Sequence, residues 1–288
     1  MTIGSVDKTL KMLYHMIMKY KAIFCDFDGT LYRDDYTVSE KNITAIKEYI
    51  ARGGRFVIST GRLFSSILPH LQKFGLVGEV IVSQGAGIYD IASGNKIWDK
   101  TFEPDQAIEC ALFAETFDNV VPMAYIGEDC FASEPSDIVD KFANICRIPI
   151  NFTHCPMSEY FKKISACPSK VLVLMSEDFA ETFVKKGSNK FGDNYYLCRS
   201  QKFLVELLKA GVNKGLAVEF LCNRYNIDID DVICVGDSEN DISMIKLAGK
   251  GIAVGNAFDD VKAAADCVMQ ETNDEDAVAA IINRYCYD

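Results

Sequence analysis

The feature that most constrains the fold is a rhythm of short apolar runs, each followed by a polar turn and then by a helix-forming segment. Near the start of the chain these runs are residues 21–27 (KAIFCDF), 55–59 (RFVIS) and 79–83 (EVIVS). Near the end they are residues 231–235 (DVICV) and 251–254 (GIAV). Short β-prone runs that alternate with helical segments predict parallel strands joined by right-handed crossovers. The sequence therefore predicts an α/β fold built on a parallel sheet.

The rhythm stops at Gln84, and the segment that follows has a different pattern. Residues 87–91 and 96–100 are β-prone and flank the turn residues Ser-Gly-Asn, which is a hairpin signal. Residues 193–199 and 202–208 look like a second hairpin. Between the two hairpins, helical stretches mix with β-prone runs. This middle part is predicted to be an α+β domain inserted into the sheet domain.

The predicted domain organisation follows from these two patterns. Residues 18–84 and 210–288 are predicted to form the core domain, and residues 85–209 an inserted cap domain. A chain of 288 residues is long enough for two domains. Residues 1–17 are interpreted as an N-terminal extension that precedes the first strand.

Charge and composition exclude several classes of function. A formal net charge of −11 without a basic run argues against nucleic acid as a partner. No segment approaches the run of about 18 apolar residues that a membrane helix needs, so no membrane partner is expected. The 11 cysteines form no CxxC pair, and the N-terminus lacks the features of a signal peptide. Unpaired thiols in such number favour a cytoplasmic location.

Acidic side chains follow two of the predicted strands. Asp26 and Asp28 come directly after the first strand, and Gly29 allows a sharp turn whose amides could meet phosphate oxygens. Asp237 and Asp241 follow the late strand 231–235, four residues apart. Ligands of open α/β sheets bind beyond the carboxyl ends of the strands, and carboxylates there suit Mg²⁺. A surface turn and an acid-rich first helical turn are the alternative interpretations of the two clusters.

Two further positions suit an anion. Thr60 and Gly61 follow the second strand, where a hydroxyl and exposed amides can bind phosphate, although a plain helix cap explains them as well. Lys214 stands in the first turn of a predicted helix, where a lysine opposes the helix dipole. A nearby negative group would offset that opposition, and a solvated surface lysine is the alternative. Together these positions supply what phosphoryl transfer requires: a metal site, a nucleophile, an acid/base and positive charge.

The four segments, in this order and spacing, resemble the motifs of the haloacid dehalogenase superfamily. They read DFDGTL at 26–31, STGR at 59–62, VNKG at 212–215 and GDSEND at 236–241. Within the superfamily the chain looks like the Cof-type hydrolases of subclass IIB, which carry a large α/β cap. The resemblance implies a Rossmann-like core and an Mg²⁺-dependent phosphatase that acts through an aspartyl-phosphate.

The resemblance also implies roles for the acidic residues. Asp26 is the nucleophile and a metal ligand. Asp28 protonates the leaving group and then activates water, and its backbone carbonyl binds the metal. Asp237 binds the metal directly, and Asp241 does so directly or through water.

The remaining motif residues are implied to bind substrate. Thr60 and Lys214 hold the phosphate, Asn240 contacts the phosphate or its ligands, and Gly61 and Arg62 line the entrance. One departure from the family is visible, because an Asn-Gly-Ala sequence is usual at the entry to the cap and this chain has Gln84-Gly85-Ala86. Glutamine keeps the amide group of asparagine on a longer side chain.

The expected partner is a small phosphorylated metabolite, such as a sugar phosphate, a nucleotide or a phosphorylated cofactor. The protein is expected to be a monomer or a small homo-oligomer. Two alternatives stay open, a phosphomutase of the same superfamily and a catalytically silent protein that binds sugar phosphates. A receiver-type signalling domain, which also phosphorylates an aspartate, lacks the large insertion and has about half this length.

Overall fold

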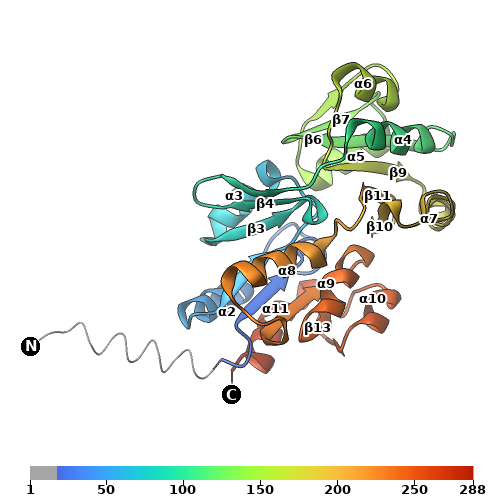
Figure 1. Ribbon diagram of the computed structural model, residues 1–288. Coiled ribbons are helices and arrows are strands. Elements are labelled where there is room, and N and C mark those ends of the chain that lie inside the picture. Colours follow the sequence, from blue (N-terminus) through green and yellow to red (C-terminus); the bar gives the residue numbers. More distant parts are fainter. Residues whose placement is uncertain (1–17, 288) are drawn as a thin grey trace, which may run out of the picture. The chain divides into compact units, whose positions relative to one another are not determined.

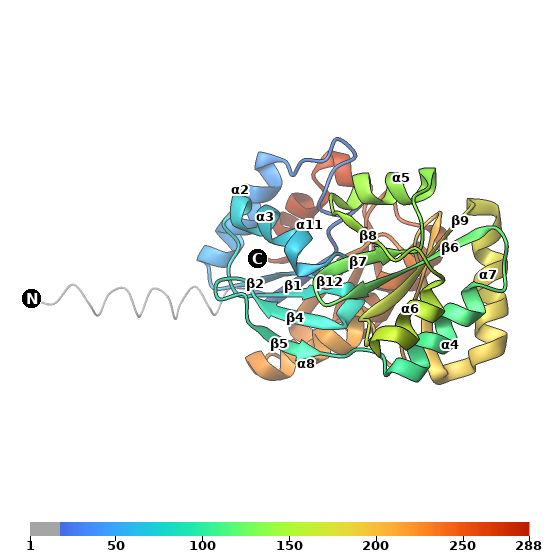
Figure 2. The same ribbon diagram turned by 90° about the horizontal axis from the view of Figure 1, so that it is seen from above.

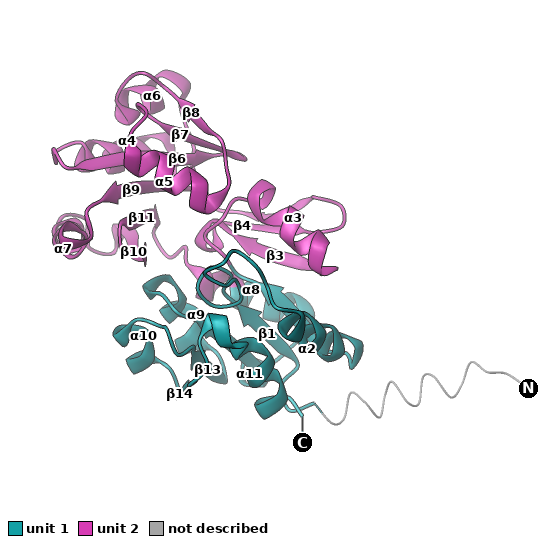
Figure 3. Ribbon diagram, turned by 180° about the vertical axis from the view of Figure 1, so that it is seen from behind, with its two compact units in different colours: residues 1–59, 218–288 teal, residues 60–217 magenta. Residues whose placement is uncertain are grey.

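The structure is a computed structural model that describes residues 18–287. The predicted N-terminal extension lies outside the described residues. The chain divides into two compact units (Figure 3): unit 1 comprises residues 1–59 and 218–288, and unit 2 comprises residues 60–217. The predicted cap, residues 85–209, falls within unit 2, and the predicted core and cap boundaries stay a prediction.

Unit 1 is built from both ends of the chain, which are blue and red in Figure 1. Its strands are β1 (Ala22–Cys25), β2 (Arg55–Ile58), β12 (Val232–Gly236), β13 (Lys250–Ala253) and β14 (Cys267–Val268). Its helices are α2 (Glu40–Ala51), α9 (Ile242–Leu247), α10 (Asp259–Ala264), α11 (Ala277–Tyr285) and the larger part of α8 (Lys214–Tyr225).

The strands of unit 1 form one parallel sheet in the order β14-β13-β12-β1-β2. All residues of β1 and β12 are buried, as expected for a sheet that is covered on both faces. The chain leaves β1 toward β2 on one side, whereas β12, β13 and β14 succeed one another on the other side. The strand order therefore reverses between β1 and β12, and such a switch point is where open α/β sheets bind ligands. The predicted α/β fold class is confirmed.

Side-chain hydrogen bonds fix the start of α2 and join this helix to α11. Ser39 caps α2, because its hydroxyl accepts a hydrogen bond from the Asn42 backbone NH over 3.0 Å. The buried side chain of Asn42 in turn accepts a bond from the backbone NH of Ala279 in α11 over 2.9 Å. This bond satisfies one of the first NH groups of α11 and holds α11 against α2.

Unit 2 contains two sheets. The smaller consists of β3 (Glu79–Val82), β4 (Gly87–Asp90) and β5 (Lys96–Asp99). The larger has the order β10-β11-β9-β6-β7-β8. Its strands are β6 (Val120–Ile126), β7 (Asp129–Ala132), β8 (Ile150–Phe152), β9 (Lys170–Met175), β10 (Tyr195–Gln201) and β11 (Leu204–Lys209). The helices are α3 (Phe64–Phe74), α4 (Pro104–Ala114), α5 (Asp137–Cys146), α6 (Met157–Ile164) and α7 (Glu177–Phe191).

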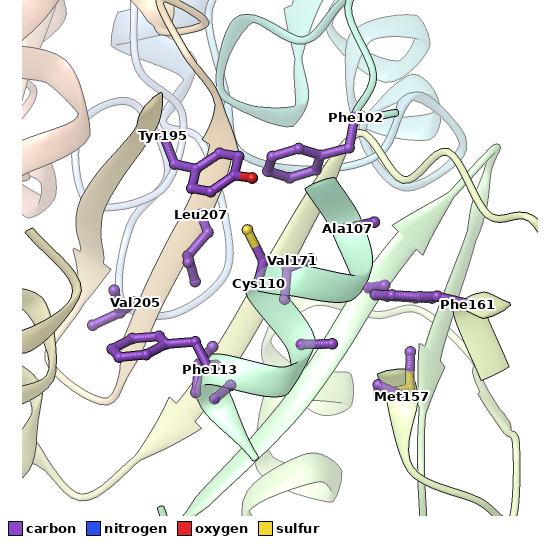
Figure 4. Close-up of a cluster of buried hydrophobic side chains, with 14 of the residues drawn as sticks. Phe102, Ala107, Cys110, Phe113, Met157, Phe161, Val171, Tyr195, Val205 and Leu207 are labelled. Atoms are coloured by element: carbon purple, nitrogen blue, oxygen red, sulfur yellow. The ribbon is translucent and has the colours of Figure 1, made fainter. Parts of the chain in front are cut away.

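Helices cover both faces of the six-stranded sheet. Figure 2 shows α5 on one side of β6 and β9, with α4 and α6 on the other. Side chains of α4, α6 and α7 pack on one face, with Phe113, Phe161 and Phe183 among them. Figure 4 shows Phe113 and Phe161 in this cluster. On the opposite face, Phe142 of α5 packs against Leu172 and other residues of the sheet. The six-stranded sheet is therefore packed on both faces by hydrophobic side chains.

Both predicted hairpins are found, as β4–β5 and β10–β11.

One expected strand pairing differs from the structure. The run 79–83 was expected to extend the parallel sheet, but β3 pairs antiparallel with β4 in the smaller sheet. The cause is the turn between them, since Ser83, Gln84 and Gly85 have φ angles of +49°, +60° and +93°. Three consecutive residues in this left-handed region reverse the chain at once, and β3 and β4 become neighbours.

Within the described residues, no helix has the length and apolar character that crossing a membrane would require.

Candidate active site

Three buried carboxylates converge at the switch point of the unit 1 sheet. Asp26 follows β1, Asp237 follows β12, and Asp241 ends the short 3-10 turn before α9. Each offers an oxygen that lies within 4.8 Å of the oxygens of the other two. The sheet register explains the meeting, because Cys25 is opposite Val235 and the Asp26 backbone NH donates to the Val235 carbonyl over 2.9 Å. The acidic residues that follow two adjacent parallel strands therefore lie close together at the same edge of the sheet.

Hydrogen bonds fix the orientation of two of these carboxylates. The Thr30 hydroxyl donates to Asp237 Oδ1 over 2.9 Å, and the Ser238 hydroxyl donates to Asp237 Oδ2 over 2.8 Å. Asp241 Oδ2 accepts from the backbone NH groups of Asp237 and Ser238, over 2.9 and 3.1 Å. The second of these bonds belongs to a capping box in which Ser238 and Asp241 satisfy each other's backbone. The carboxylates of Asp237 and Asp241 are therefore oriented by the turn that contains them and by Thr30.

Two glycines make room for the acids. At Gly29, where φ is +83°, a Cβ atom would lie 2.7 Å from Asp237 Oδ2. At Gly236 a Cβ atom would lie 2.3 Å from Asp241 Cγ and 2.4 Å from its Oδ2. Real Cβ contacts are longer than this, so any larger residue would displace the carboxylate. The glycines of both motifs thus serve the close packing of the acidic cluster.

The donor set fits a hard divalent cation. Buried carboxylates at this separation repel one another, and a cation among them would offset that repulsion. All three ligand candidates are carboxylates, which Mg²⁺ prefers over nitrogen or sulfur. Asp26, Asp237 and Asp241 are all predicted metal residues, and the structure brings them together. The fourth predicted metal ligand is the backbone carbonyl of Asp28, two residues after Asp26 in the chain.

Asp28 and Asn240 complete the predicted residues of unit 1. Asp28 is partly exposed, unlike Asp26, and a β-bridge with Tyr32 holds its backbone. Partial exposure suits a residue that must exchange a proton with substrate and then with water. Asn240 is 5% exposed and lies in the same short turn as Asp241. Their roles in chemistry stay predictions.

Unit 2 contains the predicted phosphate-binding residues Thr60 and Lys214, which both lie near the turn at Gln84 and Gly85. The Gln84 backbone NH donates to the Thr60 carbonyl over 3.1 Å, and Thr60 is itself 1% exposed. Gly85 packs against the carbonyl of Asn213, to which a Cβ atom would approach within 2.2 Å. Asn213 caps α8, because its Oδ1 accepts from the Leu216 backbone NH over 2.9 Å. Lys214, the first residue of α8, is fully buried.

Arg62 lies in the same segment as Thr60, and its guanidinium forms hydrogen bonds within unit 2. It donates to the carbonyls of Ile145 and Cys146, over 3.2 and 3.3 Å, at the end of α5. A cation at the carboxyl end of a helix satisfies carbonyls that lack partners within the helix. These contacts tie the segment after β2 to α5, and the predicted role of Arg62 at the entrance stays a prediction.

Two buried charged residues of unit 2, Lys170 and Glu206, are not among the residues predicted from the sequence. Each is 1% exposed, and together they form an ion pair. A signal was present in the sequence, since Lys170 is the lone charge in the run KVLVLM and Glu206 is the lone charge in the apolar run LVELL that precedes Lys209. Lone charges of opposite sign in buried strands indicate a pair, because an unpaired buried charge is strongly unfavourable.

The chain belongs to the haloacid dehalogenase-like hydrolases. The sequence model of that family matches residues 23–282, which include all four motif segments. The predicted family is thereby confirmed. A solved structure of a haloacid dehalogenase-like hydrolase from Bacteroides thetaiotaomicron has the same fold, with a TM-score of 0.77 and 27% identity, and the match covers 92% of this chain and 99% of that one.

Curated relatives include proteins named as phosphatases. One is 5-amino-6-(5-phospho-D-ribitylamino)uracil phosphatase YcsE of Bacillus subtilis, which is 29% identical over 265 residues, covering 92% of this chain and 95% of the relative. Phosphatase YwpJ of the same organism is 26% identical over 280 residues, covering 90% and 97%. The chain spans about half of a third relative, the chloroplastic endoribonuclease YBEY of Arabidopsis thaliana, at 28% identity over 280 residues, 93% of this chain and 47% of the relative.

Proposed function

We propose that this chain is an Mg²⁺-dependent phosphatase that hydrolyses phosphate monoesters of small metabolites through an aspartyl-phosphate on Asp26. The observation that carries the proposal is the convergence of Asp26, Asp237 and Asp241 at the sheet switch point. Membership in the hydrolase family and the phosphatase names of two relatives support it. In this proposal Asp26, Asp237, Asp241 and the carbonyl of Asp28 hold the metal.

The proposed reaction has two displacements at phosphorus. A carboxylate oxygen of Asp26 bonds to phosphorus while the bond from phosphorus to the ester oxygen breaks, and Asp28 gives its proton to that oxygen. A water molecule then attacks phosphorus, its proton passes to Asp28, and the bond to Asp26 breaks. The products are the alcohol and inorganic phosphate, and both aspartates return to their starting states. A bound Mg²⁺ would supply positive charge that reduces repulsion between the aspartates and the phosphate.

The phosphate itself is assigned to groups with hydrogen-bond donors. Thr60 and Lys214 hold its oxygens, and Asn240 and the Gly29 amide are further candidates. Thr60 follows Ser59, whose backbone NH donates to the Cys25 carbonyl over 2.9 Å at the residue before Asp26. The peptide chain itself therefore links the predicted phosphate-binding segment to the end of β1.

The proposed substrates are small phosphorylated metabolites, since the relative YcsE is named for one. The proposed location is the cytoplasm. All 11 cysteines are free thiols, and free thiols in this number suit a reducing compartment.

The test is turnover of the purified full chain on an aryl phosphate, with Mg²⁺ present and after chelation. Phosphate release should depend on Mg²⁺ and stop when the ion is removed. A panel of sugar phosphates, nucleotides and phosphorylated cofactors then ranks the substrates. No release from any ester with Mg²⁺ present would reject the phosphatase proposal and favour a silent binding protein.

The same assay separates hydrolysis from phosphomutase activity. A phosphatase releases one inorganic phosphate for each ester consumed, with water as the only acceptor. A phosphomutase consumes ester and yields an isomeric ester, with little inorganic phosphate. Equal amounts of phosphate and alcohol at every time point are the expected result.

A further inference from the structure

Unit 2 buries an ion pair among apolar residues of its six-stranded sheet. Lys170 of β9 and Glu206 of β11 are each 1% exposed. Strand alternation puts Lys170 on the same sheet face as Leu172, and Glu206 is opposite Leu172 in the antiparallel register. Neighbours on that face are Leu174 and Leu204 of the same two strands, with Met123 and Tyr125 of β6 opposite Leu172 and Lys170. Taking two charges out of water is unfavourable, and apolar replacements of buried pairs are often neutral or stabilising. The pair therefore calls for an explanation other than stability.

The two charged groups reach out of the sheet toward the segment after β2. Lys170 Nζ donates to the Gly61 carbonyl over 2.7 Å and also bonds to Glu206 Oε1. Glu206 Oε2 accepts a hydrogen bond from the side-chain amide of Gln84. The Lys170 ammonium also lies 4.5 Å from the centroid of the Tyr125 ring. A continuous line of contacts therefore runs from Gly61 through Lys170 and Glu206 to Gln84.

Gln84 also contacts the predicted phosphate-binding segment directly, at Thr60 and Gly61. The Gln84 backbone NH donates to the Thr60 carbonyl, and a Cβ atom at Gly61 would lie 2.5 Å from Gln84 Nε2. Thr60 and Gly61 are thus held by their carbonyls, one through the Gln84 backbone and one through Lys170. The Thr60 hydroxyl accepts from the Arg62 backbone NH over 3.2 Å. The fixed Thr60 carbonyl orients the Thr60–Gly61 peptide plane, whose Gly61 NH would face a phosphate together with the Thr60 hydroxyl.

This line of contacts also reaches the start of α8. Gln84 is held in the left-handed region at a φ of +60°, which a residue other than glycine rarely adopts. Gly85, next in the chain, packs on the carbonyl of Asn213, directly before Lys214. The hydrogen bond between Gln84 and Glu206 stabilises the Gln84–Gly85 turn, which packs against the start of α8. The side-chain amide of Gln84 therefore has a structural role, which is its hydrogen bond to Glu206.

We propose that Lys170 and Glu206 are positioning residues, which fix the phosphate-binding groups Thr60 and Lys214 through Gly61 and the Gln84–Gly85 turn. The inference rests on the proposed function only in taking those two groups as the ones that hold phosphate. Lys170 and Glu206 act through their neighbours and do not themselves contact substrate. Their loss therefore weakens phosphate binding and slows turnover without removing a reacting group.

The first test replaces the pair with apolar residues, Lys170→Met with Glu206→Leu, so that no charge is left buried alone. The matched control is Lys202→Met with Glu177→Leu, the same change at an ion pair of unit 2 whose side chains are 66% and 60% exposed. Melting temperature reports folding. The kcat and KM for an aryl phosphate with Mg²⁺, and the inhibition constant of inorganic phosphate, report the site.

We expect the buried double variant to fold, to lose roughly tenfold to a hundredfold in kcat/KM and to bind inorganic phosphate about tenfold more weakly, because small misplacements of binding groups have effects of this order. The exposed control should match the wild type. Unchanged kcat/KM and phosphate inhibition in a folded double variant would show that the pair is only structural and overturn the proposal.

A second variant covers the case in which the double variant does not fold. Gln84→Met removes one hydrogen bond to Glu206 and leaves the ion pair intact. It should raise the inhibition constant of phosphate in the same direction by a smaller factor. Unchanged phosphate inhibition in this variant would exclude Gln84 as the link between the pair and the site.

Hydrogen exchange separates this inference from the proposed function. Amides of residues 60–62 and 84–86 should exchange faster in the variants than in the wild type, whether or not the protein is a phosphatase. A wild type without turnover would reject the phosphatase proposal alone. Unchanged exchange in both segments would reject the positioning role alone.

Discussion

Asp26 takes its position from the last hydrogen bond of a parallel ladder, in which its backbone NH donates to the Val235 carbonyl. Asparagine has nearly the same shape and would keep that backbone position, but it lacks the negative charge that attacks phosphorus. Asp26→Asn should therefore fold normally and lose at least about a thousandfold in kcat. Asp118→Asn, at an exposed aspartate, is the control. Near-normal turnover of the Asp26 variant in an Mg²⁺ assay would contradict the proposed mechanism.

Asp28 differs from Asp26 in being partly exposed, which suits proton exchange. Removal of a general acid typically slows a reaction by about a hundredfold to ten-thousandfold. The loss should be greatest for esters with poor leaving groups, which need the proton most. Asp28→Asn should therefore slow alkyl phosphates much more than nitrophenyl phosphate, as measured by kcat for each ester. Equal slowing of both classes would show that Asp28 is not the acid.

At the scale of elements, the end of β12 must be a glycine because Asp241 occupies the space of a side chain. A Cβ atom at Gly236 would lie 2.3 Å from Asp241 Cγ. Gly236→Ala should displace that carboxylate and raise the Mg²⁺ concentration for half-maximal activity by about tenfold, the size of effect seen when groups around a metal site are disturbed. The measurement is phosphatase rate against Mg²⁺ concentration.

The control for this change is Gly127→Ala in the turn between β6 and β7. Gly127 has a φ of +62° and nothing within 4 Å of a Cβ atom, so alanine there adds backbone strain without a clash. Stability should fall by about 1 kcal/mol, while the Mg²⁺ dependence stays at the wild-type value. An equal Mg²⁺ dependence in both variants would mean that the Gly236 contact does not shape the metal site.

The sequence predicted the elements wherever a local signal existed. Short apolar runs gave β1, β2 and β12, and turn residues gave both hairpins, because strand and turn preferences act over a few residues. The acidic cluster was also predictable, since acids that follow adjacent parallel strands must meet at one edge. Asp26 and Asp237 were therefore placed together correctly without any knowledge of distances.

Contacts that depend on packing could not be predicted in this way. The antiparallel pairing of β3 follows from left-handed φ angles at Ser83 and Gln84, which neither residue type favours. The bonds from Arg62 to the end of α5 join residues more than 80 positions apart in sequence. Lys170 and Glu206 meet only once β9 and β11 pair. Such contacts follow from tertiary structure, which no local preference encodes.

At the scale of the whole molecule, the buried thiols link stability to alkaline pH. Burial raises the pKa of Cys222 to about 11 and that of Cys286 to about 12, from the ordinary value of 9.0. A pKa that is higher in the folded state means that the folded protein binds more protons than the unfolded chain between the two values. The stabilisation is complete below the ordinary pKa and is lost as pH rises through the folded pKa.

The expected result is a urea midpoint that is flat below about pH 9 and falls between roughly pH 9 and 12, the interval between the ordinary pKa and the folded pKa values of these two thiols. Tyrosines also titrate in this range, so the thiol contribution is isolated by comparison with a variant. Cys222→Ala with Cys286→Ala should start from a lower stability, because buried atoms are removed, but should fall less steeply with pH. Cys167→Ala, at an exposed thiol, should keep the wild-type slope. If the double variant and the wild type lose stability in parallel, the buried thiols do not control the alkaline limit of this fold.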